Sequence, residues 1–263
     1  MEDIMSTKNY GELGRASGLQ FEEKLKVKHS CTYPIDQKDI WGEKITKSKA
    51  DLLNGSNRFS VKNPKSENTS IQVQVCSANR FNRLFNPPEN VKIALNQFVG
   101  NHSKLLTIEG YKRNPKALQE ACADWNISTI NLSNTQELNR GRLLTNNIAS
   151  ISDLIDWLNN NVEEIYRFVL STSFNNPSNT NVIANKIWWA RKKNDENSVV
   201  EFDIEEIITK AKNNATVSVR DSKSVICIGP ITLQMKGSGK GAAYHNMQFN
   251  LSLKDLENFM NKE

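Results

Sequence analysis

The chain has few cysteines, few histidines and no long apolar run, and each shortage narrows the classes of protein that it can encode. Its 263 residues include four cysteines and three histidines. The cysteines are far apart, so they lack the paired spacing of a zinc site, a redox dithiol or a disulfide framework, and we expect buried free thiols. No apolar stretch approaches the roughly 20 residues that a membrane-spanning helix needs, so no membrane partner is expected.

The N-terminus also lacks a targeting pattern. Its first residues do not follow the basic, apolar and small-residue order of a secretory signal, so we expect the protein to be cytoplasmic. Hydrophobic residues make up 38% of the chain and charged residues 24%, which is typical of a globular protein. The length allows one elaborate domain or two modest ones.

Positive charge is concentrated in one part of the chain. The formal net charge is +5, but residues 43–113 alone hold twelve Lys and Arg against five Asp and Glu. A local positive field of this kind attracts polyanions and suits contacts with phosphate. A solvated basic face is the alternative interpretation, and the charge alone does not decide between the two.

Apolar periodicity predicts a mixture of helices and strands. Residues 18–25 have helical spacing, whereas residues 58–62 and 70–75 alternate as strands do. Further helices are predicted over residues 87–98, 115–125 and 152–170, the last capped by Ser152, and after the cap Asp203. An antiparallel meander is predicted from residues 216–220, 224–228, 231–236 and 247–251, before a short helix that Ser252 caps. The chain is therefore predicted to be a mixed α/β (α+β) protein.

The residues that indicate chemistry are an aspartate and a lysine on neighbouring predicted strands. Asp51 is followed, after eight intervening residues, by Ser60-Val61-Lys62. Because side chains alternate along a strand, Ser60 and Lys62 should share a face, and Asp51 should meet them from the adjacent strand. A carboxylate binds Mg²⁺ through hard oxygen, and a neighbouring lysine orients or deprotonates an attacking water. The pattern indicates a metal-dependent phosphodiesterase.

This pattern resembles the PD-(D/E)xK nuclease superfamily, with Ser60 in place of the acidic residue two positions before the lysine. A closer resemblance is to the monomeric restriction endonucleases of the MspI group, some of which have an amide residue at that place. Three blocks carry it: Gly18-x-x-x-Glu22-Glu23; Lys49-Ala50-Asp51 through Ser60-Val61-Lys62-Asn63 to Ser70-Ile71; and the glycine-rich residues 231–241 with Asn246-Met247-Gln248-Phe249.

The resemblance implies a fold and separate functions for two parts of the chain. The implied fold is a restriction-endonuclease-like central mixed sheet flanked by helices, with a C-terminal antiparallel recognition sheet. Residues 1–110 would form the catalytic nuclease core. Residues 111–263 would supply a helical segment and the DNA-recognition sheet, within one cooperative unit.

The resemblance also assigns catalytic roles. Asp51 and Lys62 inherit the central ones, and Glu22, with Glu23 as its rival, takes the place of a glutamate near the metal. Mg²⁺ would be bound by Asp51, Glu22 and a main-chain oxygen near Val61. Ser60 departs from the amide of the group, so we expect it to support catalysis by holding a water.

Two segments are predicted to contact DNA. One follows a strand and concentrates hydrogen-bond donors, and the other is the glycine-rich strand-loop-strand, where backbone can approach phosphate or base edges. The candidate residues are Ser77, Asn79, Arg80, Asn82, Arg83, Lys236, Lys240, Tyr244, Asn246 and Gln248.

Two other motifs are interpreted as structural. Residues 237–241 lack the spacing of a phosphate-binding loop, so no nucleotide cofactor is expected. The segment Trp188-Trp189-Ala190-Arg191-Lys192-Lys193 mixes aromatic and basic residues as some single-strand binders do. A core tryptophan followed by a solvated basic loop is the favoured interpretation.

The sequence thus predicts a type II restriction endonuclease. It would hydrolyse double-stranded DNA at a short, specific, G·C-containing palindrome in a Mg²⁺-dependent reaction that leaves 5′-phosphate ends. The enzyme is expected to be a monomer, with a cognate DNA methyltransferase as its genetic partner. The alternatives are a repair or structure-directed nuclease, and a catalytically silent DNA-binding module of the same fold.

Overall fold

A computed structural model describes most of the chain, in two compact units. The described residues are 10–34, 37–38, 44–45, 49–99, 148–172, 183–220, 225–235 and 246–262. The first unit comprises Met1–Thr69 and Asn176–Glu205, and the second comprises Ser70–Asn175 and Glu206–Glu263. The functional division at residue 110 stays a prediction, since it was drawn from the resemblance and not from compactness.

The first unit contains a four-stranded mixed sheet in the order β3-β4-β6-β7. β3 (Leu52–Asn54) and β4 (Asn57–Lys62) form an antiparallel hairpin. β4 runs parallel to β6 (Lys186–Ala190), and β6 is antiparallel to β7 (Val199–Asp203). β1 (Gln37–Lys38) and β2 (Lys44–Ile45) form a separate antiparallel pair.

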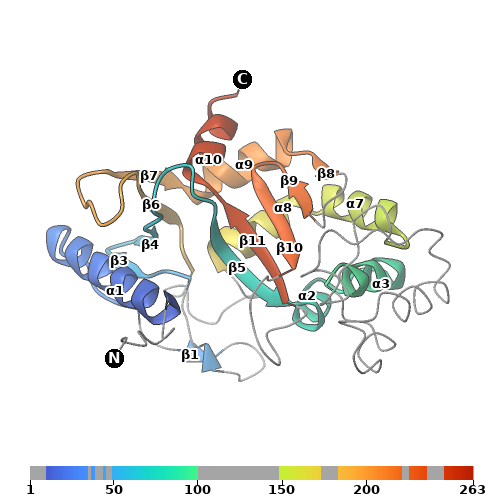
Figure 1. The fold of residues 1–263 in the computed structure, drawn as a ribbon, viewed down its shortest axis with the longest axis horizontal. Coiled ribbons are helices and arrows are strands. Elements are labelled where there is room, and N and C mark those ends of the chain that lie inside the picture. The colour runs from blue at the N-terminus through green and yellow to red at the C-terminus, as the bar shows by residue number, and fades with distance from the viewer. Residues whose placement is uncertain are drawn as a thin grey trace, which may run out of the picture. The chain divides into compact units, whose positions relative to one another are not determined.

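One face of this mixed sheet is covered by helix α1 (Tyr10–Lys28), as Figure 1 shows. Phe21 and Leu25 of the helix are buried in a cluster with these residues of the sheet and its approaches: Cys31, Leu52, Phe59, Val61, Trp188 and Ala190. The rings of Phe59 and Trp188 stack with centroids 3.7 Å apart. Because side chains alternate along β4, Ser60 and Lys62 face away from α1.

The second unit contains a five-stranded antiparallel sheet in the order β5-β11-β10-β9-β8. Its strands are β5 (Ile71–Ser77), β8 (Val217–Val219), β9 (Val225–Ile228), β10 (Ile231–Met235) and β11 (Asn246–Leu251). The predicted C-terminal meander is therefore confirmed. β5 pairs with β11 and extends the meander by one strand, which the sequence did not predict.

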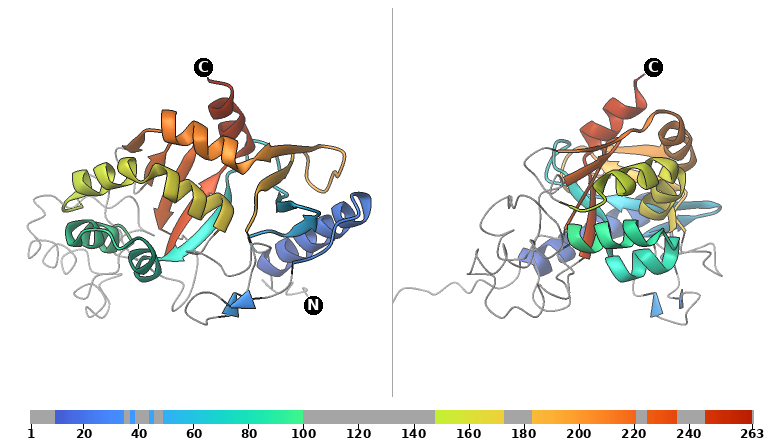
Figure 2. Two further views of the ribbon diagram at one scale, coloured as in Figure 1. Left: turned by 180° about the vertical axis from the view of Figure 1, so that it is seen from behind. Right: turned by 90° about the vertical axis from the view of Figure 1, so that its right-hand side faces the viewer.

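Several helices accompany this antiparallel sheet, and α7 and the turns after it run across one of its faces (Figure 2). They are α2 (Ala78–Phe85), α3 (Glu89–Phe98), α7 (Ile151–Asn160), α8 (Val162–Tyr166), the π-helix η3 (Arg167–Thr172), α9 (Ile204–Asn214) and α10 (Leu253–Met260). Phe81, Phe168 and Phe249 bring a helix, the π-helix and a strand into one aromatic cluster. The Tyr166 hydroxyl donates to the carbonyl of Ile228 at 2.8 Å.

The predicted class, mixed α/β, is confirmed, and most predicted elements are present. The helices at residues 18–25 and 87–98 correspond to α1 and α3. The predicted caps of the last two helices are also confirmed, since Asp203 Oδ1 accepts from the Glu205 amide and Ser252 Oγ accepts from the Asp255 amide. The helix predicted over residues 115–125 lies outside the described residues.

The prediction of one continuous helix over residues 152–170 was wrong. The segment breaks at Asn161 and ends as a π-helix, although the apolar stripe predicted as core is buried at Leu154, Leu158, Val162, Ile165, Tyr166 and Val169. Ser152 lies inside α7, and the cap position is Ser150, in a left-handed conformation with φ 56° and no side-chain cap bond. The buried apolar stripe continues on both sides of Asn161, so the apolar spacing gave no signal for the break.

The remaining structural predictions concern cysteines, tryptophans and membrane spans. Cys31 and Cys76 are buried free thiols, Cys227 is a half-buried one, and Cys122 lies outside the described residues. Both Trp188 and Trp189 are buried, and the basic run that follows them is exposed. In the part of the chain that the structure describes, no helix has the length and apolarity to cross a membrane.

Candidate active site

Asp51 lies immediately before β3, and the main chain of β4 fixes it. Its own amide donates to the carbonyl of Phe59 at 2.7 Å, which continues the hairpin ladder by one residue. Its carboxylate Oδ2 accepts from the amide of Val61 at 2.7 Å. A carboxylate held by a backbone donor keeps its orientation without a flexible partner. The side chain is 28% exposed, so solvent or a ligand can reach it.

Lys62 reaches the same carboxylate from the end of β4. Its ammonium Nζ lies 3.9 Å from Asp51 Oδ2, donates to Ser60 Oγ at 2.6 Å and donates to the Val61 carbonyl at 3.2 Å. The side chain is only 15% exposed. Strand alternation predicted that Ser60 and Lys62 share a face that Asp51 meets from the neighbouring strand, and the structure has this arrangement.

Lys49 is a second lysine beside this cluster, and sequence reasoning gave it no role. The residue is only 7% exposed. Burial holds the pKa of the Lys49 amine well below its usual 10.5; the charge of Lys62 lowers it further and that of Asp51 opposes the shift. The signal in the sequence was a lysine two residues before the key aspartate. The burial of Lys49, however, depends on tertiary packing, which sequence periodicity does not predict.

Trp189 lies beside Lys62 on the neighbouring parallel strand. The two residues are partners in the register between β4 and β6, so their side chains leave the sheet on the same face. Trp189 is fully buried, and among the described residues its indole Nε1 has no hydrogen-bond partner. The lysine is therefore flanked by a large apolar ring, which limits access of bulk water from that side.

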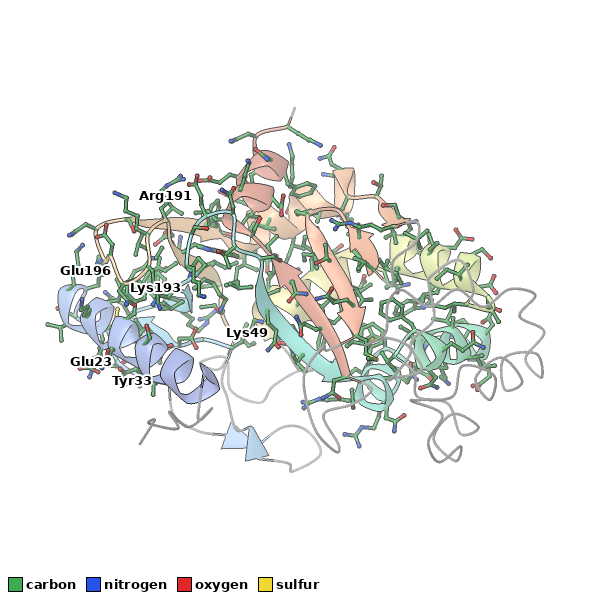
Figure 3. The ribbon with its side chains drawn as sticks, in the orientation of Figure 1. Glu23, Tyr33, Lys49, Arg191, Lys193 and Glu196 are labelled. Carbon is green, nitrogen blue, oxygen red and sulfur yellow. The ribbon has the colours of Figure 1, made fainter. Side chains whose placement is uncertain are left out.

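The two glutamates proposed for the metal site lie on α1. Glu23, the rival candidate, accepts from Tyr33 Oη at 2.6 Å and from Lys26 Nζ at 2.9 Å, and both bonds lower the pKa of its carboxyl. Figure 3 shows Glu23 beside Tyr33 and well apart from Lys49. Glu22 is half-buried. Burial raises the pKa of Tyr33 to about 12, with further contributions from the hydrogen bond to Glu23, the charge of Glu23 and, least, the charge of Glu22. The role of Glu22 near a metal stays a prediction.

The oxygen atoms of the cluster suit one hard cation with few protein ligands. The donors are the Asp51 carboxylate, whose Oδ1 accepts no hydrogen bond within the described residues, and the nearby Val61 carbonyl. The described residues include no group of three or more His, Cys, Asp or Glu that could bind a metal by itself. Mg²⁺ commonly takes one or two carboxylates and completes its octahedron with water and substrate phosphate, so the donors present fit it.

The first predicted DNA-contact segment forms α2, a helix that the sequence did not predict. Ser77 is its N-cap, since Ser77 Oγ accepts from the Arg80 amide at 3.1 Å. Asn79 and Arg83 are exposed, whereas Arg80 and Asn82 are half-buried. Burial raises the pKa of the Cys76 thiol to about 12, and the charge of Arg80 opposes this rise. Ser77 thus has a structural role whether or not it touches DNA.

The second predicted DNA-contact segment is described only in its strands. Asn246 and Gln248 lie on one face of β11, opposite Ser77 and Val75 of β5. Gln248 Nε2 donates to Asn250 Oδ1 at 2.7 Å, across a register shift between Phe249 and Asn250. Lys236, Lys240 and Tyr244 lie outside the described residues.

Comparisons with known proteins add little to this geometry. No protein-family model matches the chain, and no curated protein matches it. Among solved structures the chain is similar to the restriction endonuclease MspI in complex with its cognate DNA, with 12% sequence identity and a TM-score of 0.40. The match covers 91% of this chain and 78% of that chain. A TM-score at this level does not establish a common fold.

Proposed function

We propose that the protein is a Mg²⁺-dependent DNA endonuclease whose active site is formed by Asp51, Val61 and Lys62. One observation carries the proposal. A carboxylate fixed by the Val61 amide at 2.7 Å lies 3.9 Å from a lysine ammonium that is itself held by a serine and a carbonyl. An oriented oxygen ligand beside a confined positive charge is what hydrolysis of a phosphodiester requires.

Each residue has a distinct part in the proposed reaction. Asp51 and the Val61 carbonyl provide oxygen ligands for Mg²⁺, which supplies charge neutralisation at phosphorus and a lower pKa for bound water. Lys62 orients the attacking water through its remaining N–H group and stabilises the negative charge that develops on the phosphoryl oxygens. Glu22 contributes a further oxygen in this proposal. The products are a 5′-phosphate and a 3′-hydroxyl.

The finer assignment is to the type II restriction class, acting at a short G·C-containing palindrome in double-stranded DNA. It is supported by the three sequence blocks that resemble the MspI group. It is also supported by the amide side chains of Asn246 and Gln248, which suit hydrogen bonds to base edges. A restriction role further requires the cytoplasm and a cognate DNA methyltransferase, which would be encoded by a neighbouring gene.

A digestion experiment tests the proposal. Purified protein is incubated with a fully sequenced, unmethylated phage DNA in Mg²⁺ and in EDTA, and the products are separated and their ends mapped. Discrete bands that appear only in Mg²⁺, with 5′-phosphate ends, are the expected result. A smear, or cleavage at junctions and flaps, would indicate a repair or structure-directed nuclease instead.

A catalytically silent DNA-binding module is a second candidate, because Ser60 stands where the superfamily has an acidic residue. This candidate predicts intact DNA in Mg²⁺ together with binding that weakens steeply as salt rises. The same digestion, paired with a binding assay at two salt concentrations, separates it from the nuclease.

A further inference from the structure

Ser60 has an unusual place in the cluster, because it is the most deeply buried polar residue there. Its exposed fraction is 1%, and its Oγ accepts the shortest hydrogen bond of the cluster, 2.6 Å from Lys62 Nζ. The strand fixes both ends of this contact, since residues two apart on β4 have their side chains on the same face. The hydroxyl is therefore committed to the lysine by the geometry of the strand.

Within the part of the chain that the structure describes, the hydrogen bonds of Lys62 leave one N–H group for chemistry. An ammonium has three N–H groups, and two of them point at Ser60 Oγ and the Val61 carbonyl. Asp51 Oδ2, at 3.9 Å, attracts the charge without accepting a hydrogen bond. Two fixed bonds define the direction of the third N–H group. Without Ser60, the Lys62 ammonium would keep only its hydrogen bond to the Val61 carbonyl and could rotate about it.

The same contact argues against Ser60 as a metal ligand. A Mg²⁺ ion bound to Oγ would lie about 2.1 Å from that oxygen. Since Oγ is 2.6 Å from Lys62 Nζ, the cation would stand within about 5 Å of a positive charge in a half-buried site. The neutral hydroxyl carries no charge to offset the Coulomb repulsion, whereas the Asp51 carboxylate, whose Oδ2 lies 3.9 Å from the same ammonium, brings a negative charge that attracts both cations.

We propose that Ser60 is a positioning residue that holds the Lys62 ammonium in register with Asp51, in place of the metal ligand that an acidic residue would provide. The inference rests on the proposed function for its catalytic consequence, but the contact itself can be tested without cleavage.

The test uses Ser60→Ala, Ser60→Thr and, as a matched control on the same hairpin, Ser56→Ala, whose serine is exposed in the turn. The first measurement is competitive acetylation of the folded protein with trace acetic anhydride, followed by mass spectrometry of the Lys62 peptide. The reactivity of Lys62 relative to Lys65 should change severalfold in Ser60→Ala and stay unchanged in Ser56→Ala. Unchanged reactivity in Ser60→Ala would overturn the inference, whether or not the protein cuts DNA.

The second measurement is cleavage rate against Mg²⁺ concentration. Loss of one hydrogen bond to a charged group should lower kcat of Ser60→Ala about tenfold or more, with the Mg²⁺ concentration for half-maximal rate unchanged. Ser60→Thr keeps the hydroxyl and should recover most of the rate. If Ser60→Ala needs more Mg²⁺ for half-maximal rate but reaches the wild-type kcat at saturating Mg²⁺, Ser60 is a metal ligand and the inference is overturned.

The outcomes separate the two proposals. If the wild-type protein does not cut any DNA, the proposed function fails and acetylation still decides whether Ser60 holds Lys62. If the wild type cuts and Ser60→Ala cuts equally well, the proposed function stands and the positioning role fails. Thermal unfolding of each variant checks that Ser60→Thr, which adds a methyl group in a buried place, is folded.

Discussion

At the scale of single residues, the candidate site combines rigid and flexible parts. Asp51 is fixed by two main-chain contacts of β4, through the Phe59 carbonyl and the Val61 amide. Lys62 has a long flexible chain, and side-chain contacts confine it to 15% exposure. The bond from the Asp51 amide to the Phe59 carbonyl is independent of the side chain, so single changes at Asp51 and Lys62 should alter chemistry more than folding.

Replacing Asp51 by Asn should remove catalysis while keeping the hairpin. The amide side chain retains an oxygen that can accept from the Val61 amide, but it lacks the charge that binds Mg²⁺. Mg²⁺-dependent cleavage should fall by at least about 100-fold. Glu67→Gln makes the same chemical change at an exposed place in the same unit and should cut normally. Equal activity of the two variants would contradict the role of Asp51.

Glu201 gives a pH-dependent prediction within the same unit. Burial raises the pKa of its carboxyl, but hydrogen bonds from Lys186 Nζ and Trp188 Nε1, each 2.8 Å long, outweigh burial and lower the pKa below 4.5. A lowered folded-state pKa contributes stability above about pH 4.5, and this stability is lost as pH falls through the folded value. Because the side chain is 45% exposed, the contribution should be under about 1 kcal/mol.

Urea unfolding of Glu201→Gln and wild type at several pH values measures this contribution. The variant should be less stable at pH 7, and the two curves should converge near pH 3. A constant difference across this range would mean that the ionised carboxylate is not what stabilises the fold.

The sequence predicted the residues of this site unevenly. Asp51, Ser60 and Lys62 were predictable because strand alternation is local and strict. The alignment of Trp189 with Lys62 was not, since it depends on the parallel pairing of β4 with β6, more than a hundred residues later. Pairing between strands that are distant in the chain produces no repeating pattern in the sequence of either strand.

At the scale of elements, tight turns and caps determine how helices and strands meet. Gly229 joins β9 to β10 with φ +56°, a left-handed conformation that side chains disfavour. A Cβ there would lie 2.7 Å from Tyr166 Oη and 3.1 Å from Ala215 Cβ. The turn therefore brings the sheet close to the helices that cover it, and a glycine is required for that approach.

Gly229→Ala should destabilise the protein by roughly 2–4 kcal/mol, from left-handed strain and the clash with Tyr166 together. Gly55→Ala is the matched control, because Gly55 has φ +59° and no atom within 4 Å of an added Cβ. The control should lose only about 1 kcal/mol, from strain alone. Thermal unfolding measures both. Equal losses would show that the close approach to Tyr166 does not matter.

Ser77 and Asn79 allow the capping role of α2 to be separated from DNA contact. Ser77→Ala removes the cap of the Arg80 amide and should cost about 1 kcal/mol of stability. Asn79→Ala, an exposed position in the first turn, should leave stability unchanged and weaken DNA binding if this turn enters the interface. Unfolding and binding are measured on both variants. A stable Ser77→Ala variant would rule out the capping role.

Elements were predicted best where their pattern was long and their partners were sequence neighbours. The β8–β11 meander follows chain order, so alternation and turns sufficed. α2 was missed because hydrogen-bonding residues over Ser77 to Arg83 suggested a contact loop, although Ala78, Phe81 and Leu84 form its buried face. The break at Asn161 was missed because an apolar stripe continues through it.

At the scale of the whole molecule, the sheet that carries Lys62 is assembled from distant parts of the chain. β3 and β4 come from the first seventy residues, whereas β6 and β7 follow residue 183. A division at residue 110 would separate β4 from its parallel partner, so residues 1–110 alone should not form this sheet. The overall charge of +5 is modest, and the proposed attraction to DNA therefore relies on local clusters.

The most direct test of the account compares Lys62→Ala with Lys65→Ala, which removes an exposed lysine three residues later. Both variants and the wild type are incubated with unmethylated phage DNA in Mg²⁺, and binding to the cleaved sequence is measured in Ca²⁺. We predict that Lys62→Ala binds DNA but does not cut it, while Lys65→Ala yields the wild-type bands. Full cutting by Lys62→Ala would contradict the assignment of the active site.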